Sequence, residues 1–125
     1  MNQNKSAIIL FGHGARAPSW ALPFQRLQTM LQARLPQHHV GLAFLEFMTP
    51  NLPDLVHSYV ELGVEKIQIT PIFIGQGGHI LKDLPILVDQ LRAQFPQLEI
   101  NLVAAVGEDD IVLQAIADYC IRVMN

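Results

Sequence analysis

The amino-acid sequence predicts an α/β fold, a three-layer sandwich around a four-stranded parallel sheet in the order 2-1-3-4. Strand-like apolar runs alternate four times with helix-like apolar stripes along the 125 residues, which is the pattern of βα units. The first run, Ala7 to Phe11, is apolar without interruption, as in a strand buried on both faces of a parallel sheet. The length fits one domain, residues 1–125.

The first predicted strand is placed in the middle of the sheet because it is the most apolar. It ends at Gly12-His13-Gly14. Each connection to the next strand is long enough to make the two strands parallel, and such crossovers are right-handed. The other three predicted strands cover Val40 to Phe47, Lys66 to Ile74 and Leu98 to Val106.

Four segments carry apolar residues at the three- and four-residue spacing of a helix face. Ser19 is the expected cap of the first helix. Asp83 is the expected cap of the third helix, which would leave His79 in the preceding glycine-rich loop. Asp109 or Asp110 lies near the start of the last helix, where a negative charge suits the helix dipole. The expected helices cover residues 20–35, 52–60, 83–95 and 111–123.

Composition narrows the classes of function. The net charge is -3 and no basic run stands out, which argues against a nucleic-acid binder. The segment Met1 to Lys5 is polar and the apolar run after it is short, so neither a secretory leader nor a membrane segment is expected. The only cysteine, Cys120, excludes an internal disulfide and is expected to be buried. These features predict a cytoplasmic protein.

Three residues with metal-binding side chains follow neighbouring strands of the predicted sheet. His13 follows the first strand, Glu46 closes the second, and His79 follows the third. Ligands of open parallel sheets bind at this carboxyl edge. Two imidazoles and a carboxylate suit Co, Ni, Fe(II) or Zn and leave coordination positions open. The sequence therefore predicts an open site for a divalent metal, with no organic cofactor.

The residues around this predicted site leave other interpretations open. His13 can instead bond a loop carbonyl, and Glu46 can cap the next helix or pair with a surface lysine. The glycines near His79, Gly77 and Gly78 among them, allow a flat ligand to approach the backbone. They can equally receive phosphate, although no GxGxxG or Walker pattern is present. Two cations flank the histidines and can pair with substrate carboxylates: Arg16 and Lys82.

These same segments resemble the small class II tetrapyrrole chelatases, the sirohydrochlorin cobaltochelatases and ferrochelatases of CbiX/SirB type. The His-Gly-x-Arg run alone is weakly specific, but its combination with the downstream Gly-His-x-x-x-Asp run is fairly specific, and the resemblance extends over nearly the whole chain. The matching segments are Gly12-His13-Gly14-Ala15-Arg16, Phe44-Leu45-Glu46, Pro71 to Pro85 and Ala104-Ala105-Val106-Gly107.

The resemblance implies a flavodoxin-like sandwich, a homodimer with its cleft between the copies, and insertion of Co²⁺, Fe²⁺ or Ni²⁺ into sirohydrochlorin or a related tetrapyrrole. It also implies that His13, His79 and Glu46 bind the metal and serve the reaction, in cobalamin or siroheme biosynthesis. Histidine and glutamate can both hold a metal and accept pyrrole protons. A metal or tetrapyrrole carrier without turnover is the alternative. A third alternative is a hydrolase with phosphatase-like histidine chemistry, suggested by the His-Gly-x-Arg run. That chemistry needs further arginines and histidines around the phosphate, and the sequence offers no obvious candidates.

Overall fold

The computed structural model describes residues 5–124 and contains the four expected strands and four expected helices. Residues 1–4 and residue 125 lie outside the described residues. The expectation that the N-terminal segment is not a leader falls on residues 1–4 and therefore lies outside them as well. Short 3-10 helices precede the first and the last α-helix. The elements are β1 (Ser6–Gly12), η1 (Pro18–Ala21), α1 (Leu22–Arg34), β2 (His39–Phe44), α2 (Leu52–Glu61), β3 (Lys66–Pro71), α3 (Gly78–Gln94), β4 (Glu99–Leu102), η2 (Val106–Glu108) and α4 (Asp110–Arg122).

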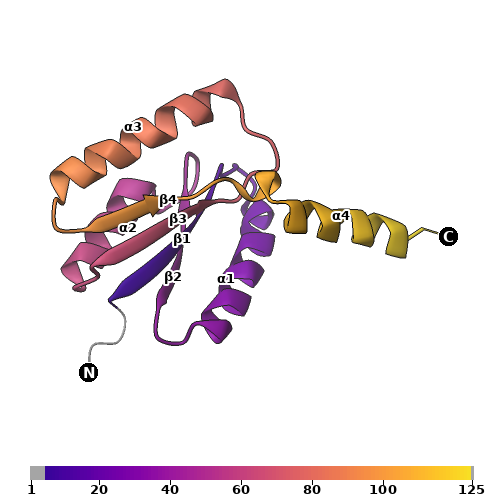
Figure 1. The fold of residues 1–125 in the computed structure, drawn as a ribbon, viewed down its shortest axis with the longest axis horizontal. Coiled ribbons are helices and arrows are strands. Elements are labelled where there is room, and N and C mark those ends of the chain that lie inside the picture. The colour runs from indigo at the N-terminus through magenta and orange to yellow at the C-terminus, as the bar shows by residue number, and fades with distance from the viewer. Residues whose placement is uncertain (1–4, 125) are drawn as a thin grey trace.

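The four strands form one parallel sheet in the order β2-β1-β3-β4, as predicted (Figure 1). At the centre, Ile9 of β1 pairs with Gly41 of β2 on one side and with Ile69 of β3 on the other. Because every strand runs the same way, all four carboxyl ends lie along one edge. The candidate site residues follow three of these ends.

The main core lies between the sheet and the pair α2 and α3. Ile9, Ile67 and Ile69 are no more than 1% exposed. Leucine and valine side chains of α2 and α3 close over them, among them Leu52, Val56, Leu84 and Val88. Burial of this apolar surface is the main stabilising contribution to the fold.

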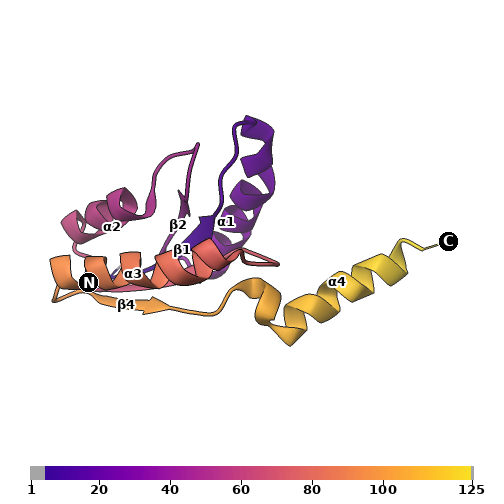
Figure 2. The same ribbon diagram turned by 90° about the horizontal axis from the view of Figure 1, so that it is seen from above.

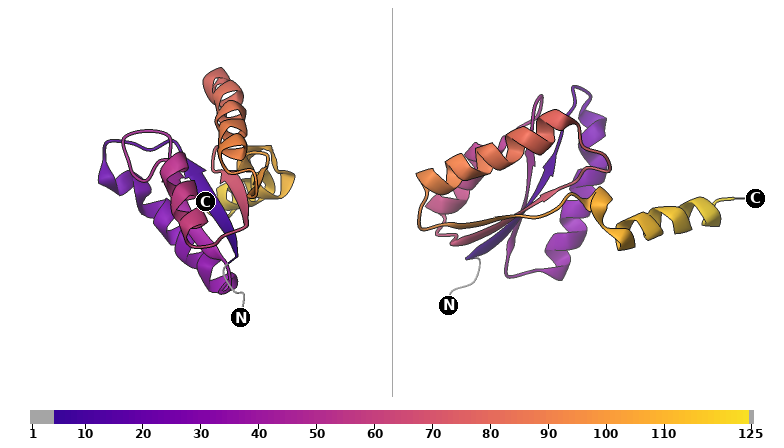
Figure 3. Two further views of the ribbon diagram at one scale, coloured as in Figure 1. Left: turned by 90° about the vertical axis from the view of Figure 1, so that its left-hand side faces the viewer. Right: turned by 45° about the horizontal axis from the view of Figure 1, so that its top comes forward.

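The last helix forms where it was expected, but it does not lie on the sheet. After η2 the chain turns, and α4 runs away from the rest of the molecule to the C-terminus (Figures 2 and 3). No residue of α4 is buried. Cys120 is exposed on this helix, so the expectation of a buried thiol is wrong for the single chain. Among residues 5–124, no helix is long and apolar enough to span a membrane.

The face of the sheet away from α2 and α3 is covered unevenly. On β3 the buried residues Ile67 and Ile69 alternate with Lys66 and Gln68, which are exposed on the other face. Helix α1 packs on β2 at that other face. The sandwich therefore has three layers around β2, whereas β3 and β4 are bare on the side opposite α3.

Two predicted helix starts are wrong. Helix α1 begins at Leu22 with Ala21 as its N-cap, because Ser19 is inside the 3-10 turn η1. Helix α3 begins at Gly78, so Asp83 is inside the helix and does not cap it. Gly77 is the N-cap and Gly78 the first residue of this helix, whereas the sequence had suggested a glycine-rich loop that runs through His79. His79 is consequently a residue of the first helical turn.

Candidate functional site

The loops after β1 and β2 are joined by backbone hydrogen bonds. Leu45 donates its N–H to the carbonyl of Gly12 at 2.9 Å, and Glu46 donates to the carbonyl of His13 at 3.0 Å. Gly14 makes this approach possible: its φ is +86°, and a Cβ there would overlap the Glu46 carbonyl. His13 and Glu46, both exposed, are thus held next to each other at the carboxyl edge of the sheet.

Phe73 supports the imidazole of His13. The two ring centroids are 4.5 Å apart, with an angle of 44° between the planes. Phe73 is only 3% exposed and also meets the edge of Phe11 at 6.0 Å. This phenyl ring is packed in the core on one side and contacts the histidine on the other, so it limits the orientations that His13 can adopt.

His79 stands at the start of α3 with its side chain 92% exposed. Its Nδ1 lies 3.3 Å from Oδ2 of Asp83, one helical turn further along. A carboxylate beside Nδ1 favours the tautomer with a proton on that nitrogen, which leaves Nε2 free as a metal ligand. Asp83, expected as a helix cap, is therefore placed to orient His79.

A second pair of loops, after β3 and β4, is also joined. Gly107 donates to the carbonyl of Phe73 at 2.9 Å, and a Cβ on Gly107 would overlap Ile74. Nε2 of Gln76 donates to Oε2 of Glu108 at 3.0 Å. These contacts fix the segment that leads into α3. Glu108 was missed by the sequence analysis, because nothing in its immediate sequence indicates a partner more than thirty residues away.

The glycines before His79 face open space. No atom lies within 4 Å of a Cβ built on Gly75, Gly77 or Gly78. The first backbone N–H groups of α3 have no partner within the helix, as in every helix. Room for a ligand therefore exists at this helix start, next to a set of N–H donors.

The three predicted ligands are only partly brought together. His13 and Glu46 are adjacent, whereas His79 is on α3. Within residues 5–124 no three His, Cys, Asp or Glu side chains lie close enough to form a metal-binding group. The complete set of His13, Glu46 and His79 therefore remains a prediction, and its assembly requires movement of exposed side chains.

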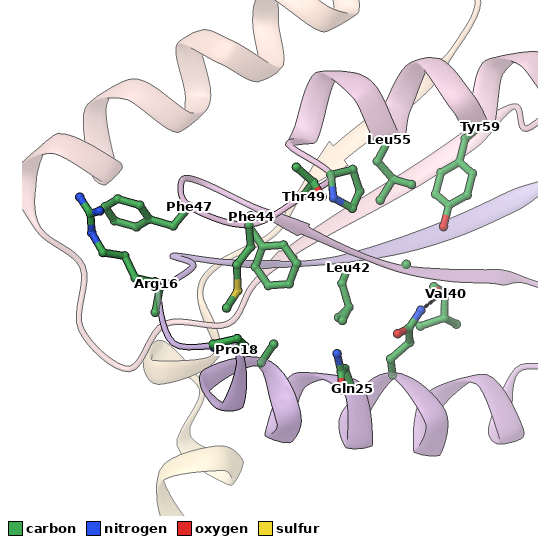
Figure 4. Close-up of a pocket in the computed structure, with 16 residues that line it drawn as sticks. Arg16, Pro18, Gln25, Val40, Leu42, Phe44, Phe47, Thr49, Leu55 and Tyr59 are labelled. Carbon is green, nitrogen blue, oxygen red and sulfur yellow. Dashed lines mark hydrogen bonds between the residues drawn. The ribbon is translucent and has the colours of Figure 1, made fainter.

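Arg16 and Lys82, the two predicted substrate-binding cations, are both exposed. The Arg16 guanidinium lies 4.5 Å from the centroid of the Phe47 ring, a cation–π contact. Arg16 and Phe47 stand at one end of a hollow of about 710 Å³ that runs along the free edge of β2 to Tyr59 (Figure 4), whereas Lys82 does not line it. In the same view β2 lies between α1 and α2. Neither histidine lines this hollow, and Glu46 does not line it either.

A family model described as CbiX matches residues 7–122. The chain belongs to the CbiX family. Two relatives are named sirohydrochlorin cobaltochelatase: one from Methanococcus maripaludis is 29% identical over 63% of this chain and 55% of its own length. The other, from Methanothermobacter thermautotrophicus, is 30% identical over 65% of this chain and 56% of its own length. This CbiX family chain thus spans little more than half of the relatives it matches.

Solved structures share the fold of this CbiX family member. A putative cobalamin biosynthesis CbiX protein from Marinobacter aquaeolei superimposes with a TM-score of 0.83 at 26% identity, over 94% of this chain and 95% of that chain. The sirohydrochlorin chelatase SirB from Bacillus subtilis subspecies spizizenii, in complex with cobalt, gives 0.79 at 20% identity, over 94% of this chain and 50% of that chain. The second likeness concerns the fold alone.

Proposed function

We propose that this chain inserts a divalent metal, Co²⁺, Fe²⁺ or Ni²⁺, into sirohydrochlorin or a related tetrapyrrole. The observation that carries the proposal is the backbone hydrogen bond from Glu46 to the His13 carbonyl, which holds a histidine and a glutamate next to each other in the chain fold at the ligand-binding edge of the sheet. Membership of the CbiX family supports the same conclusion, as do the relatives named sirohydrochlorin cobaltochelatase.

The proposed reaction needs two kinds of group. A partly dehydrated metal ion must be held by ligands that exchange, and two pyrrole N–H protons must leave as the ion enters the macrocycle. His13 and His79 are the proposed metal ligands through imidazole nitrogen. Glu46 is the proposed acceptor of pyrrole protons and a further ligand. The products are the metallated macrocycle and two protons, so charge and atoms balance without an organic cofactor.

The substrate is rich in carboxylates, and this chain offers groups that would bind them. Arg16 is exposed beside Glu46's neighbour Phe47, and Lys82 follows His79 on α3. The free N–H groups at Gly77 and Gly78 would bind a carboxylate at the helix start, where the helix dipole favours negative charge. These contacts would orient the macrocycle even though the net charge of the chain is -3.

We also propose that residues 1–125 act as one chelatase-like domain and that two copies pair with the cleft between them. A single copy leaves the proposed site open: His13, Glu46 and His79 are all exposed. The cytoplasm is the proposed location, because the lone cysteine suits a reducing compartment. The product would feed cobalamin or siroheme synthesis.

Absorbance spectroscopy of sirohydrochlorin tests this function. The purified protein is mixed with the macrocycle and with each of the three metals in turn, and the spectral change is followed against the reaction without protein. Acceleration with at least one metal, over many turnovers, is the expected result. No acceleration with any of them would refute the proposal.

The same measurement distinguishes the proposed enzyme from the alternative, a metal or tetrapyrrole carrier without turnover. A carrier would bind sirohydrochlorin or the metal in stoichiometric amounts and leave the rate of insertion unchanged. The exposure of His13 and His79 is compatible with either role, so turnover decides between them.

A further inference from the structure

The hollow along the free edge of β2 contains polar groups that have no partner within the described chain. Its volume of about 710 Å³ is in the range of small-molecule sites. Its walls come from α1, from α2 and from β2, which lies between the two helices (Figure 4). None of the three proposed metal ligands lines it. The hollow is therefore a separate place from the proposed metal site.

The first of these polar groups is the backbone of Leu42. On the free side of β2, the N–H of Val40 donates to Oε1 of Gln32 at 3.2 Å, and the carbonyl of Val40 accepts from Nε2 of Gln28 at 2.8 Å. Backbone groups of alternate strand residues face the same way, so the N–H and C=O of Leu42 also face away from β1. Within residues 5–124 neither group has a hydrogen-bond partner on that side.

The open stretch of this strand edge is short. Phe44, two residues after Leu42, donates its N–H to the carbonyl of Pro50 at 2.9 Å. Gln28 and Gln32 thus close the edge before Leu42, and Pro50 closes it afterwards. An open strand edge can pair with another extended chain, and this edge offers one residue for such pairing.

The second polar group is the hydroxyl of Tyr59. This side chain is only 7% exposed, and its hydroxyl makes no hydrogen bond to the described part of the chain. No polar side-chain atom of residues 5–124 is both fully enclosed and without a partner, so the hydroxyl must reach the open space of the hollow that Tyr59 lines. Gly41 makes room for it, because a Cβ at this position would overlap the hydroxyl oxygen.

The third polar group is the guanidinium of Arg16, which stands at the other end of the hollow from Tyr59 (Figure 4). Among the residues that the structure describes, none of the ion pairs involves Arg16. Between the two ends the walls are largely apolar, with Phe44 and Leu55 among them. The hollow therefore combines a hydroxyl donor, an open strand edge and a cation in one row.

We infer that this hollow binds a short extended peptide whose C-terminal carboxylate pairs with Arg16. The peptide lies beside β2 as an added strand and bonds the free N–H and C=O of Leu42. A carbonyl at its N-terminal end accepts a hydrogen bond from the Tyr59 hydroxyl, and an apolar side chain packs on Phe44 and Leu55. Because Arg16 stands at the carboxyl end of β2, the peptide runs parallel to that strand.

The spacing along β2 sets the length of the ligand. Gly41, below the Tyr59 hydroxyl, and Phe44 are three residues apart, which is about 10 Å along a strand. Three residues of an extended peptide cover this distance. A longer peptide gains no further pairing, because Gln28 and Gln32 already occupy the edge at Val40. The ligand is therefore a small peptide with a free carboxylate.

The test titrates the isotope-labelled full chain with N-acetyl-alanyl-valyl-leucine and follows the backbone amide signals by NMR. Saturable binding is expected, with the largest shifts at Leu42 and its neighbours in β2. The same peptide with a C-terminal carboxamide is expected to bind at least about 10-fold more weakly, because the charge that pairs with Arg16 is lost. The same peptide with five further residues at its N-terminus is expected to bind within about 2-fold of the tripeptide.

Two variants test the ends of the hollow. Arg16→Ala should weaken binding at least about 10-fold. Arg26→Ala is the matched control, because this arginine is exposed on α1 and does not line the hollow. Tyr59→Phe keeps the ring and removes only the hydroxyl, so a loss of about 5-fold is expected. The amide spectrum of each variant verifies that it is folded.

Absence of binding up to about 10 mM peptide, or shifts confined to surfaces away from β2, would overturn the site. Equal binding of the carboxamide would overturn the pairing with Arg16, and much tighter binding of the longer peptide would overturn the limit on length. The titration contains neither metal nor tetrapyrrole and measures no turnover. Its failure is therefore distinct from a failure of the proposed insertion activity.

Discussion

The backbone N–H of Glu46 donates to the carbonyl of His13 at 3.0 Å. This bond joins the ends of two neighbouring strands and fixes the spacing of the two residues independently of any bound ion. It depends on Gly14, because any larger residue there would overlap the Glu46 carbonyl. In the proposed metal site, the backbone therefore determines the relative position of His13 and Glu46, and the side chains provide the ligands.

Gly14→Ala should lower stability and insertion rate together. The alanine would have to adopt a φ near +86° and displace the Glu46 carbonyl, at a cost of about 1–3 kcal/mol. Urea unfolding measures the first effect and the absorbance assay the second. Gly75→Ala is the control, since its Cβ would meet no atom within 4 Å. Equal stabilities of the two variants would contradict the account of this loop.

Phe73→Leu tests the support of His13. Leucine keeps an apolar side chain in the core but removes the ring that lies 4.5 Å from the imidazole. A stability loss of roughly 1–3 kcal/mol and a slower insertion are expected. Phe95→Leu, at the end of α3 and away from His13, is the matched control. If both variants slow insertion equally at a temperature where both are folded, Phe73 has no specific role at the site.

Asp83→Asn tests the orientation of His79. The amide has nearly the same shape as the carboxylate but carries no charge beside Nδ1 of His79. The preference for the tautomer with its proton on Nδ1 is therefore smaller. Metal affinity should fall by about 10- to 100-fold, as for other residues that orient metal-binding histidines. Titration with Co²⁺, followed by the visible absorption of the ion, gives the affinity. Asp89→Asn, which breaks a pair with Arg92 on the same helix, should bind the ion as wild type does.

Sequence patterns predicted the strands and their order well, but they placed the ends of the strands poorly. The apolar runs located all four strands, because the strand residues that face the core are apolar, although on β3 they alternate with exposed Lys66 and Gln68. They overran the strand ends, since Phe73 and Ala105 are also buried although they stand in loops. Hydrophobicity reports burial and does not distinguish a strand from a buried loop. The start of α3 at Gly78 was missed because glycine is accepted both in a tight loop and at a helix N-cap.

The site was predicted in part. The positions of His13, Glu46 and His79 at the carboxyl edge followed from the strand order. The partners Phe73 and Glu108 did not, because their contacts join segments distant in the chain. The exposure of Cys120 and of the rest of α4 was also missed. Periodicity shows that a helix has an apolar face, but not which molecule covers that face.

We expect the free energy of unfolding to fall at alkaline pH because of Tyr59. Its side chain is buried between α2 and β2, and burial raises the pKa of its hydroxyl above the ordinary 10.0. Above that pH the unfolded chain loses the proton first, so the folded state is progressively destabilised as pH rises. Tyr59→Phe should reduce this loss, measured as the urea midpoint against pH. An unchanged pH dependence in the folded Tyr59→Phe variant would contradict the assignment.

The central claim is tested most directly by the rate of Co²⁺ insertion into sirohydrochlorin for wild type, His13→Ala and His57→Ala. His57 is exposed on α2, where it pairs with Glu61, and so controls for the loss of a histidine away from the site. The account predicts that His13→Ala lowers kcat/KM by about 100-fold or more, while His57→Ala stays within about 2-fold of wild type. An undiminished rate in folded His13→Ala would contradict it.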